Sequence, residues 1–234
     1  MLDPLKSEPA LVDLVLDRLV GAISDGRLPP GARLTQGHVA DLLDVSRQPV
    51  SHALQMLKHK GLAVPCGRKG LAVAPIDADQ IWQLYQVRAS LDGLAARLAA
   101  SRVASGFADA AEIAAAQEAL DLGDRLDTKN EVIDFVRADV AFHKALHNLS
   151  GNQEIARTVA EQWPQFMRSM AAVLGAPNRK SRVWEEHAEI FAAIMAGDAD
   201  RAERLATEHA AKAGAETRER INLLEKSTTA AFSK

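Results

Sequence analysis

The chain has 234 residues, 47% of them hydrophobic and 25% charged, a composition typical of globular proteins and unlike that of disordered, collagen-like or membrane proteins. The net charge is −3, and a single cysteine excludes both a disulfide framework and a metal site built from several cysteines. No apolar run reaches 18 residues and the start lacks a secretory signal, so we expect a cytoplasmic protein with no membrane partner.

Aromatic residues and charge both divide the chain near residue 75. All ten aromatic residues lie beyond residue 80. Residues 1–75 hold 9 of the 28 Lys and Arg and 7 of the 31 Asp and Glu, which leaves 19 against 24, a net charge of −5, for the remainder. Within residues 27–75 the count is seven basic to two acidic, which suits a polyanionic partner. We expect a first domain at 8–75, a linker at 76–80, a second domain at 81–226 and a flexible tail at 227–234.

The first domain has the pattern of a helix-turn-helix followed by a wing. Apolar residues at helical spacing, a cap at Thr35, a break at Asp44 and a cap at Ser46 indicate three helices, the third with Pro49 tolerated in its first turn. An ordinary helical hairpin is the alternative at this point. The expected elements are helices over 11–24, from Thr35 through Leu43 and from Ser46 to about Lys60, then strands over 61–64 and 71–74.

The stretch LPPGARLTQGHVADLLDVSRQPVSHALQMLKHKGL resembles the N-terminal winged helix of GntR-family bacterial transcription regulators. The resemblance implies double-stranded DNA as partner. Departures from the family pattern are Ser51, where many members have Arg, and Gly37, where many have a charged residue. The resemblance implies base contacts by Arg47 and Gln48, a groove contact by Ser51 and wing contacts by Gly67, Arg68 and Lys69.

The second domain shows only helical periodicity. Glycine, proline and asparagine separate the segments, so we expect an all-α antiparallel bundle and, for the whole chain, a mainly α fold. The expected helices cover 79–104, 107–126, 130–149, 152–174, 179–196 and 198–225.

Polar residues interrupt the apolar stripes of three of these helices. Asp139 and His143 lie four residues apart on one face, and His187 and His209 interrupt two other stripes. A single histidine there is usually a hydrogen-bonded core residue, but one Asp and three His form an N3O set that suits a divalent metal. His147 is a rival ligand, about 80° around the helix from Asp139 at ~100° per residue.

Three blocks, VRASLDGLAARLA, RADVAFHKALHNLSGN and EEHAEIFAAIMAGDADRAERLATEHA, resemble the FCD ligand-binding domain of FadR-like GntR regulators. The resemblance implies a divalent metal on Asp139, His143, His187 and His209, with zinc expected first and nickel or manganese as alternatives. It also implies a small carboxylate effector anchored by the metal and by Arg88.

Arg88 stands in the apolar stripe Ile81, Leu84, Arg88, Leu91, Ala95 and Leu98, where a guanidinium needs an anion. The alternative to an effector is an internal ion pair with Asp92, which replaces the family's usual Glu.

These patterns predict a homodimeric DNA-binding transcription regulator, and not an enzyme. We expect it to bind a pseudo-palindromic operator under control of the effector, and to repress transcription by resemblance alone. Two alternatives remain. The first is a regulator that senses the metal without an organic effector. The second is a metal-dependent hydrolase, for which the stripes provide no separate general base.

Overall fold

The computed structural model describes residues 11–67, 70–127, 129–173 and 179–232, with side chains described for residues 182–227 of the last range. The chain forms two compact units, residues 1–76 and 77–234. Among the described residues, no helix combines the length and apolar character that a bilayer span requires.

The first unit is a winged helix. Its helices are α1 (Leu11–Ser24), α2 (Gln36–Leu43) and α3 (Arg47–His59), and its strands are β1 (Arg33–Leu34), β2 (Ala63–Cys66) and β3 (Gly70–Val73). The strands form an antiparallel sheet in the order β1-β3-β2, and Arg33 pairs with Ala72 while Pro65 pairs with Leu71. The core lies between α1 and α3, where Leu19, Val50 and Leu57 are buried.

Local sequence accounts for the turn between α2 and α3. The Thr35 side chain accepts a hydrogen bond from the His38 amide at the start of α2. Asp44 ends α2 in the left-handed conformation, with φ of 51°. The predicted Ser46 cap is only positional, because Ser46 precedes α3 without a side-chain capping hydrogen bond. The prediction also missed β1, a strand of two residues that is too short for a visible alternation.

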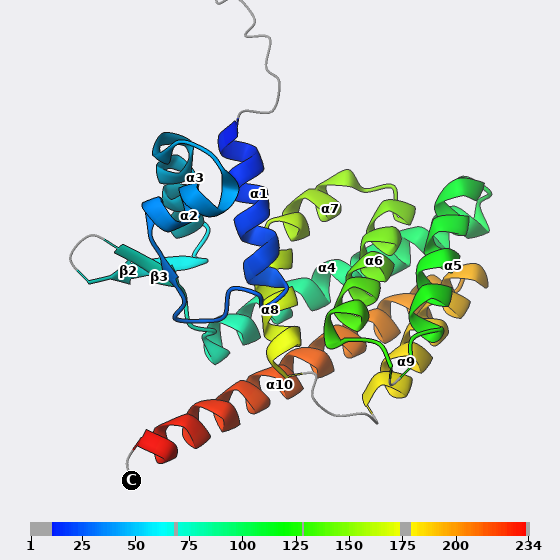
Figure 1. Cartoon of the computed structure of the whole chain (residues 1–234). Helices are drawn as coiled ribbons and strands as arrows, with labels where there is room; N and C mark the ends of the chain where they lie inside the picture. Colours follow the sequence, from blue (N-terminus) through cyan, green and yellow to red (C-terminus); the bar gives the residue numbers. More distant parts are fainter. Residues whose placement is uncertain (1–10, 68–69, 128, 174–178, 233–234) are drawn as a thin grey trace, which may run out of the picture. The chain divides into compact units, whose positions relative to one another are not determined.

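The second unit is a helical bundle (Figure 1). Its core consists mainly of alanine together with Phe142, Leu149, Ile190 and Ile194. Its helices are α4 (Ala78–Ala104), α5 (Ala110–Asp124), α6 (Val132–Leu149), α7 (Gln153–Ala160), α8 (Trp163–Val173), α9 (Arg179–Met195) and α10 (Ala199–Phe232).

Helices α4 and α10 run side by side in opposite directions along the unit (Figure 1). Asp79 near the start of α4 pairs with Arg218, and Arg97 further along α4 pairs with Glu203 near the start of α10. Two glycines allow this close approach, because a Cβ on Gly93 would lie 2.1 Å from Thr207 Oγ1 and one on Gly214 would lie 2.5 Å from Tyr85 Cβ.

Two predicted boundaries in this unit are wrong. The helix predicted over 152–174 is two helices, because Pro164 has no N–H to bond the Ala160 carbonyl and its ring would clash with that turn. The last helix is predicted to end at 225, whereas α10 continues to Phe232.

Candidate functional site

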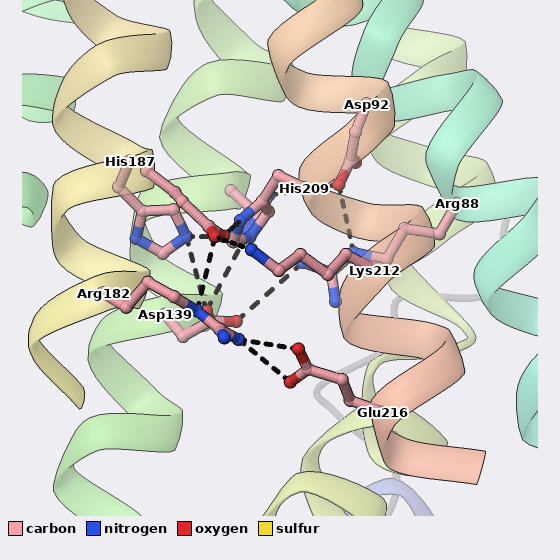
Figure 2. Close-up of polar contacts among 10 residues, drawn as sticks. Arg88, Asp92, Asp139, Arg182, His187, His209, Lys212 and Glu216 are labelled. Atoms are coloured by element: carbon pink, nitrogen blue, oxygen red, sulfur yellow. Dashed lines mark hydrogen bonds and ion pairs between the residues drawn. The ribbon is translucent and has the colours of Figure 1, made fainter. Parts of the chain in front are cut away.

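Four of the predicted residues meet inside the bundle. Asp139 and His143 come from one face of α6, His187 from α9 and His209 from α10, and one donor atom of each lies within 4.8 Å of the others. The three histidines are buried and Asp139 is partly buried. Figure 2 shows Asp139, His187 and His209 pointing toward one another. The helical spacing read from the sequence therefore predicted side chains that the structure brings together.

The facing atoms of this cluster are three Nε2 nitrogens and one carboxylate oxygen. His187 Nε2 lies 3.2 Å from His209 Nε2 and 3.5 Å from Asp139 Oδ1, and His143 Nε2 lies 3.9 Å from the same oxygen. Ligands about 2.0–2.2 Å from one tetrahedral ion stand roughly 3.3–3.6 Å from one another. The measured separations are close to that spacing.

Carboxylates outside the cluster orient two of the histidines. His143 Nδ1 lies 3.1 Å from Asp92 Oδ2, and His209 Nδ1 lies 2.8 Å from Glu186 Oε2. A ring that donates its Nδ1 hydrogen to a carboxylate keeps the Nε2 lone pair free for a metal, the usual arrangement behind metal-bound histidine.

Two histidines of the cluster, His143 and His187, favour the neutral form that binds metals. Burial, with the charge of Arg88, lowers the pKa of His143 to about 4. Burial, with the charges of His209 and His143, holds the pKa of His187 well below its ordinary value. Both rings therefore offer a lone pair at neutral pH.

Several buried polar atoms of the cluster have no hydrogen-bond partner among the described residues. They are His143 Nε2, Asp139 Oδ2 and His187 Nδ1. Leaving a buried acceptor without a donor is costly, and a cation between the facing atoms would compensate His143 Nε2, which is one of them. The residues therefore fit a divalent metal, and the N3O donor set suits zinc, nickel or manganese.

A cavity of about 60 Å³ opens beside the cluster. Arg88, Asp139, His209 and Thr217 are among its polar lining residues, and Phe135, Met170 and Trp184 are among its apolar ones. A cluster carboxylate, a cluster imidazole and a guanidinium thus border one small space, in which an anion could reach both a metal and Arg88.

Arg88 is buried among aromatic rings and carboxylates. Its Nε donates to Asp92 Oδ2 at 3.1 Å, and its Nη2 lies 3.9 Å from Asp139 Oδ2. The guanidinium carbon is 4.9 Å from the centre of the Trp163 ring and 5.1 Å from that of Phe166. The internal pair with Asp92, considered from the sequence as the alternative, is present. The ion pair involves Nε of Arg88, and Arg88 also lines the cavity.

Asp92 connects Arg88 to two histidines. Besides Arg88 and His143, it accepts a hydrogen bond from His147 Nε2 at 2.7 Å. Burial acts to raise the pKa of Asp92, but the charges of Arg88 and His143 and the hydrogen bonds outweigh it, so the pKa lies well below its usual value. His147, the rival ligand, therefore points to Asp92.

Glu186 belongs to the site and was not predicted from the sequence. It holds His209 on one side and Lys212 Nζ, at 2.7 Å, on the other. The hydrogen bond from His209, followed by that from Lys212, lowers the pKa of Glu186 to about 2. The only available signal was its position directly before His187, which does not show that it reaches a histidine of another helix.

Of the residues expected to contact DNA, the structure describes Arg47, Gln48 and Ser51 in α3 and Gly67 in the wing. Arg47 and Gln48 are exposed in the first turn of α3. Ser51 accepts a hydrogen bond from Gln36 Nε2 at 3.0 Å, which links α2 to α3. Gly67 turns the wing with φ of 65°. Arg68 and Lys69 lie outside the described residues.

A winged helix followed by a helical bundle with an inward-facing His and Asp cluster defines a regulator of the GntR type. Residues 11–73 match the gntR family of bacterial regulatory proteins and residues 83–212 match the FCD domain. The chain belongs to this family, whose members regulate transcription and are not enzymes.

Relatives of known name and structure agree with this assignment. The chain is 33% identical over 135 residues to the Nta operon transcriptional regulator of Aminobacter aminovorans, a match that covers 56% of this chain and 59% of that protein. It therefore spans about three fifths of the length of that relative. A match to the "Probable D-xylose utilization operon transcriptional repressor" of Paenarthrobacter nicotinovorans is 27% identical over 198 residues and covers 84% of each chain.

A solved structure shows the same fold. The structure of McbR/YncC from E. coli superposes with a TM-score of 0.77 at 20% identity, over 91% of this chain and 99% of that one. At this identity the likeness concerns the fold alone.

Proposed function

We propose that the protein is a cytoplasmic transcription regulator that binds double-stranded DNA as a homodimer and responds to a small carboxylate held at a divalent-metal site. Two winged helices related by twofold symmetry would each bind half of a pseudo-palindromic operator. The observation that carries the sensing part is the convergence of Asp139, His143, His187 and His209 beside the Arg88 cavity.

The roles of the site residues follow from their contacts. Asp139 and the three histidines would hold the ion, with zinc first and nickel or manganese as alternatives. When bound, the ion supplies positive charge and an open coordination position for an anion. The Nη groups of Arg88 would bind the effector carboxylate, since Arg88 lines the cavity and Asp92 holds its Nε.

The DNA contacts would come from the first turn of α3 and from the wing. Arg47 could donate two hydrogen bonds to guanine and Gln48 could pair with adenine, each worth roughly 1–3 kcal/mol of discrimination between bases. Ser51 would contact the groove, and Gly67, Arg68 and Lys69 would contact DNA from the wing. We propose repression as the outcome, which the name of the Paenarthrobacter relative supports.

The effector must change the balance between DNA-bound and free protein. Because α4 carries Arg88, α6 carries Asp139 and α10 carries His209, an anion that joins them draws three helices toward one point. A coupling free energy of about 1–3 kcal/mol between two ligands is typical of allosteric proteins.

The test first uses the zinc-loaded protein to select a DNA fragment from a random pool. The affinity of the protein for that fragment is then measured at a fixed salt concentration. Chelated, zinc-reloaded and nickel-reloaded proteins are compared with and without a panel of small mono- and dicarboxylic acids. We expect at least one acid to change the affinity about 5–150-fold in the reloaded protein only. Arg88→Lys should reduce that response, and Arg47→Ala should weaken DNA binding without loss of metal.

Other outcomes would favour a different function or overturn part of this proposal. A response to metal that no acid alters would support a metal sensor. Equal affinity in all arms would overturn the sensing proposal. Arg47→Ala with affinity within twofold of the wild type would overturn the DNA assignment.

A further inference from the structure

The cavity beside the cluster extends away from it in one direction. On α10 the lining residues follow one face of the helix and are His209, Ala210, Ala213 and Thr217. On α6 the lining continues from Asp139 to Phe135, one turn away. The stretch of α10 from His209 to Thr217 is about 12 Å long at 1.5 Å per residue. The cavity therefore has a cluster end, at His209, and a far end, at Thr217.

Contacts between the helices show which other residues lie at the far end. Arg182 on α9 pairs with Glu216 on α10 at 2.7 Å (Figure 2), so Val183 and Thr217, their chain neighbours, lie at the same level. The carbonyl of Val173, at the end of α8, accepts a hydrogen bond from an arginine in the same stretch of α10. Both valines line the cavity. The far end is thus formed by two valines and one threonine.

The lining between the two ends is mainly apolar. It includes Phe135, Met170, Val183, Trp184 and Ala213. The ring of Tyr85 belongs to the cluster end, since its centre lies 5.5 Å from the guanidinium carbon of Arg88. Of the described lining residues, Thr217 is the one polar side chain remote from that end. The middle of a ligand that fits this lining is apolar, because a polar group there would lose its hydrogen bonds to water.

Thr217 is buried, yet its hydroxyl group is not used by the protein. The residue is 2% exposed, and Oγ1 makes no hydrogen bond to any described residue. Serine and threonine in helices often bond to the carbonyl four residues earlier, as Ser227 does to Leu223 in the same helix. Thr217 does not make this bond to Ala213. A buried hydroxyl without a partner is costly, so a ligand group that bonds to it gains affinity.

We propose that Thr217 selects the effector by binding a second polar group, at the end of the molecule opposite its carboxylate. This inference rests on the proposed function, which places the carboxylate beside the metal site and Arg88. The class of ligand it assigns is a carboxylic acid with an apolar middle and a hydroxyl, carbonyl or amide group at its other end. The Thr217 hydroxyl both donates and accepts hydrogen bonds, so each of these groups is a suitable partner.

The test compares pairs of acids that differ by one hydroxyl group. Hexanoate is paired with its ω-hydroxy derivative, and phenylpropanoate with its para-hydroxy derivative. Each acid is titrated into the zinc-loaded full-length protein by isothermal titration calorimetry. We expect the hydroxylated member of at least one pair to bind roughly 2–10-fold more tightly than its parent, the gain that a single neutral hydrogen bond provides.

Two substitutions at Thr217 separate the hydroxyl group from the shape of the side chain. Thr217→Val keeps the shape and removes the hydroxyl, so the preference should disappear while the affinity for the parent acid stays within twofold. Thr217→Ser keeps the hydroxyl and should keep the preference. Because the measured quantity is a ratio of two affinities in one protein, a general loss of stability or of zinc does not imitate the effect.

The matched control is Thr207→Val, because Thr207 lies on the same helix, beside Gly93 and outside the cavity lining. Its preference should equal that of the wild type. Equal wild-type affinities within both pairs, or a preference that survives in Thr217→Val, would overturn the inference and leave the proposed function standing, since the acids still bind. Loss of the preference in Thr217→Ser or in Thr207→Val would also overturn it. If no acid binds, the inference and the proposed carboxylate effector both fail.

Discussion

Asp92 is the residue that joins the two halves of the candidate site. Its oxygens accept from Arg88, His143 and His147, so one carboxylate orients a cluster histidine and the guanidinium of the cavity together. A glutamate at this position would reach one methylene further. The shorter side chain fits because His143 and His147 both come to within 3.1 Å of Asp92.

The change Asp92→Asn removes the charge and one of the two acceptor oxygens that serve three donors. His143 would lose its fixed orientation, and loss of such an outer partner typically costs about 10–100-fold in metal affinity. We expect a decrease of that size in zinc affinity, measured by competition with a chromogenic chelator, and a smaller response to any acid that acts on the wild type.

Asp79→Asn is the control for this variant, because Asp79 is exposed on the same helix and pairs with Arg218. Its zinc affinity should equal that of the wild type. Unchanged zinc affinity in Asp92→Asn would show that Asp92 does not position His143.

Site residues could be predicted from the sequence where the spacing within a single helix reveals them. Asp139 and His143 are four residues apart, and His187 and His209 interrupt apolar stripes, so periodicity alone indicates inward-facing polar groups. The roles of Asp92 and Glu186 depend on how neighbouring helices are aligned. One sequence does not contain that alignment.

The helices themselves were largely predictable, and the exceptions have local causes. Predicted α1 coincides with the observed helix, and α4 and α6 differ by one or two residues at their starts. The break before Pro164 was missed because apolar spacing continues across it. The inward stripe predicted for α4 was wrong in part, since periodicity does not say which apolar face of a two-sided helix is the inner one.

The close packing of α4 against α10 can be tested by replacing Gly214, which lies between the two helices. A Cβ on Gly214 would lie 2.5 Å from Tyr85 Cβ, which no side-chain rotation can move, and 2.8 Å from Tyr85 Cγ. Gly214→Ala should therefore reduce the free energy of unfolding of the second unit by about 1–3 kcal/mol. Urea denaturation followed by circular dichroism measures it.

Gly21→Ala is the contrasting substitution, because Gly21 lies inside α1 and a methyl group there would meet no atom within 4 Å. Alanine at this position should stabilise the first unit by about 0.5–1 kcal/mol. A Gly214→Ala protein as stable as the wild type would show that α4 and α10 can separate without cost.

At the scale of the whole molecule, two units with separate cores should respond differently to the metal. The cluster lies entirely in residues 77–234, so an ion that binds only the folded state stabilises that unit alone. At a free metal concentration 100 times the dissociation constant, the gain is about 2.7 kcal/mol.

We therefore expect chelation to lower the unfolding temperature of the second unit and leave that of the first unchanged, as measured by calorimetry. His187→Ala should make the protein insensitive to chelation. Equal shifts of both transitions would contradict a site confined to the bundle.

The sequence was most informative about the class of protein and least informative about which faces of its helices are exposed. The motif around Arg47 and the spacing of the cluster residues define a GntR regulator with an FCD domain, in agreement with the matches at 11–73 and 83–212. The outward turn of Val87 and Leu94 could not be read from the chain, because it depends on the small residues that α10 accepts on the opposite face.

Trp184 lies where its fluorescence should report the binding of a metal ion beside the cavity. Its ring packs on Gly123, borders the cavity and lies 4.7 Å from the His187 ring, while Trp163 lies close to Arg88. Trp163 and Trp184, two of the three tryptophans of the chain, therefore lie close enough to the cluster for a bound ion to affect their fluorescence. Paramagnetic nickel or manganese should quench their emission and diamagnetic zinc should not, so the native fluorescence of the unlabelled protein would distinguish the ions and follow their loading.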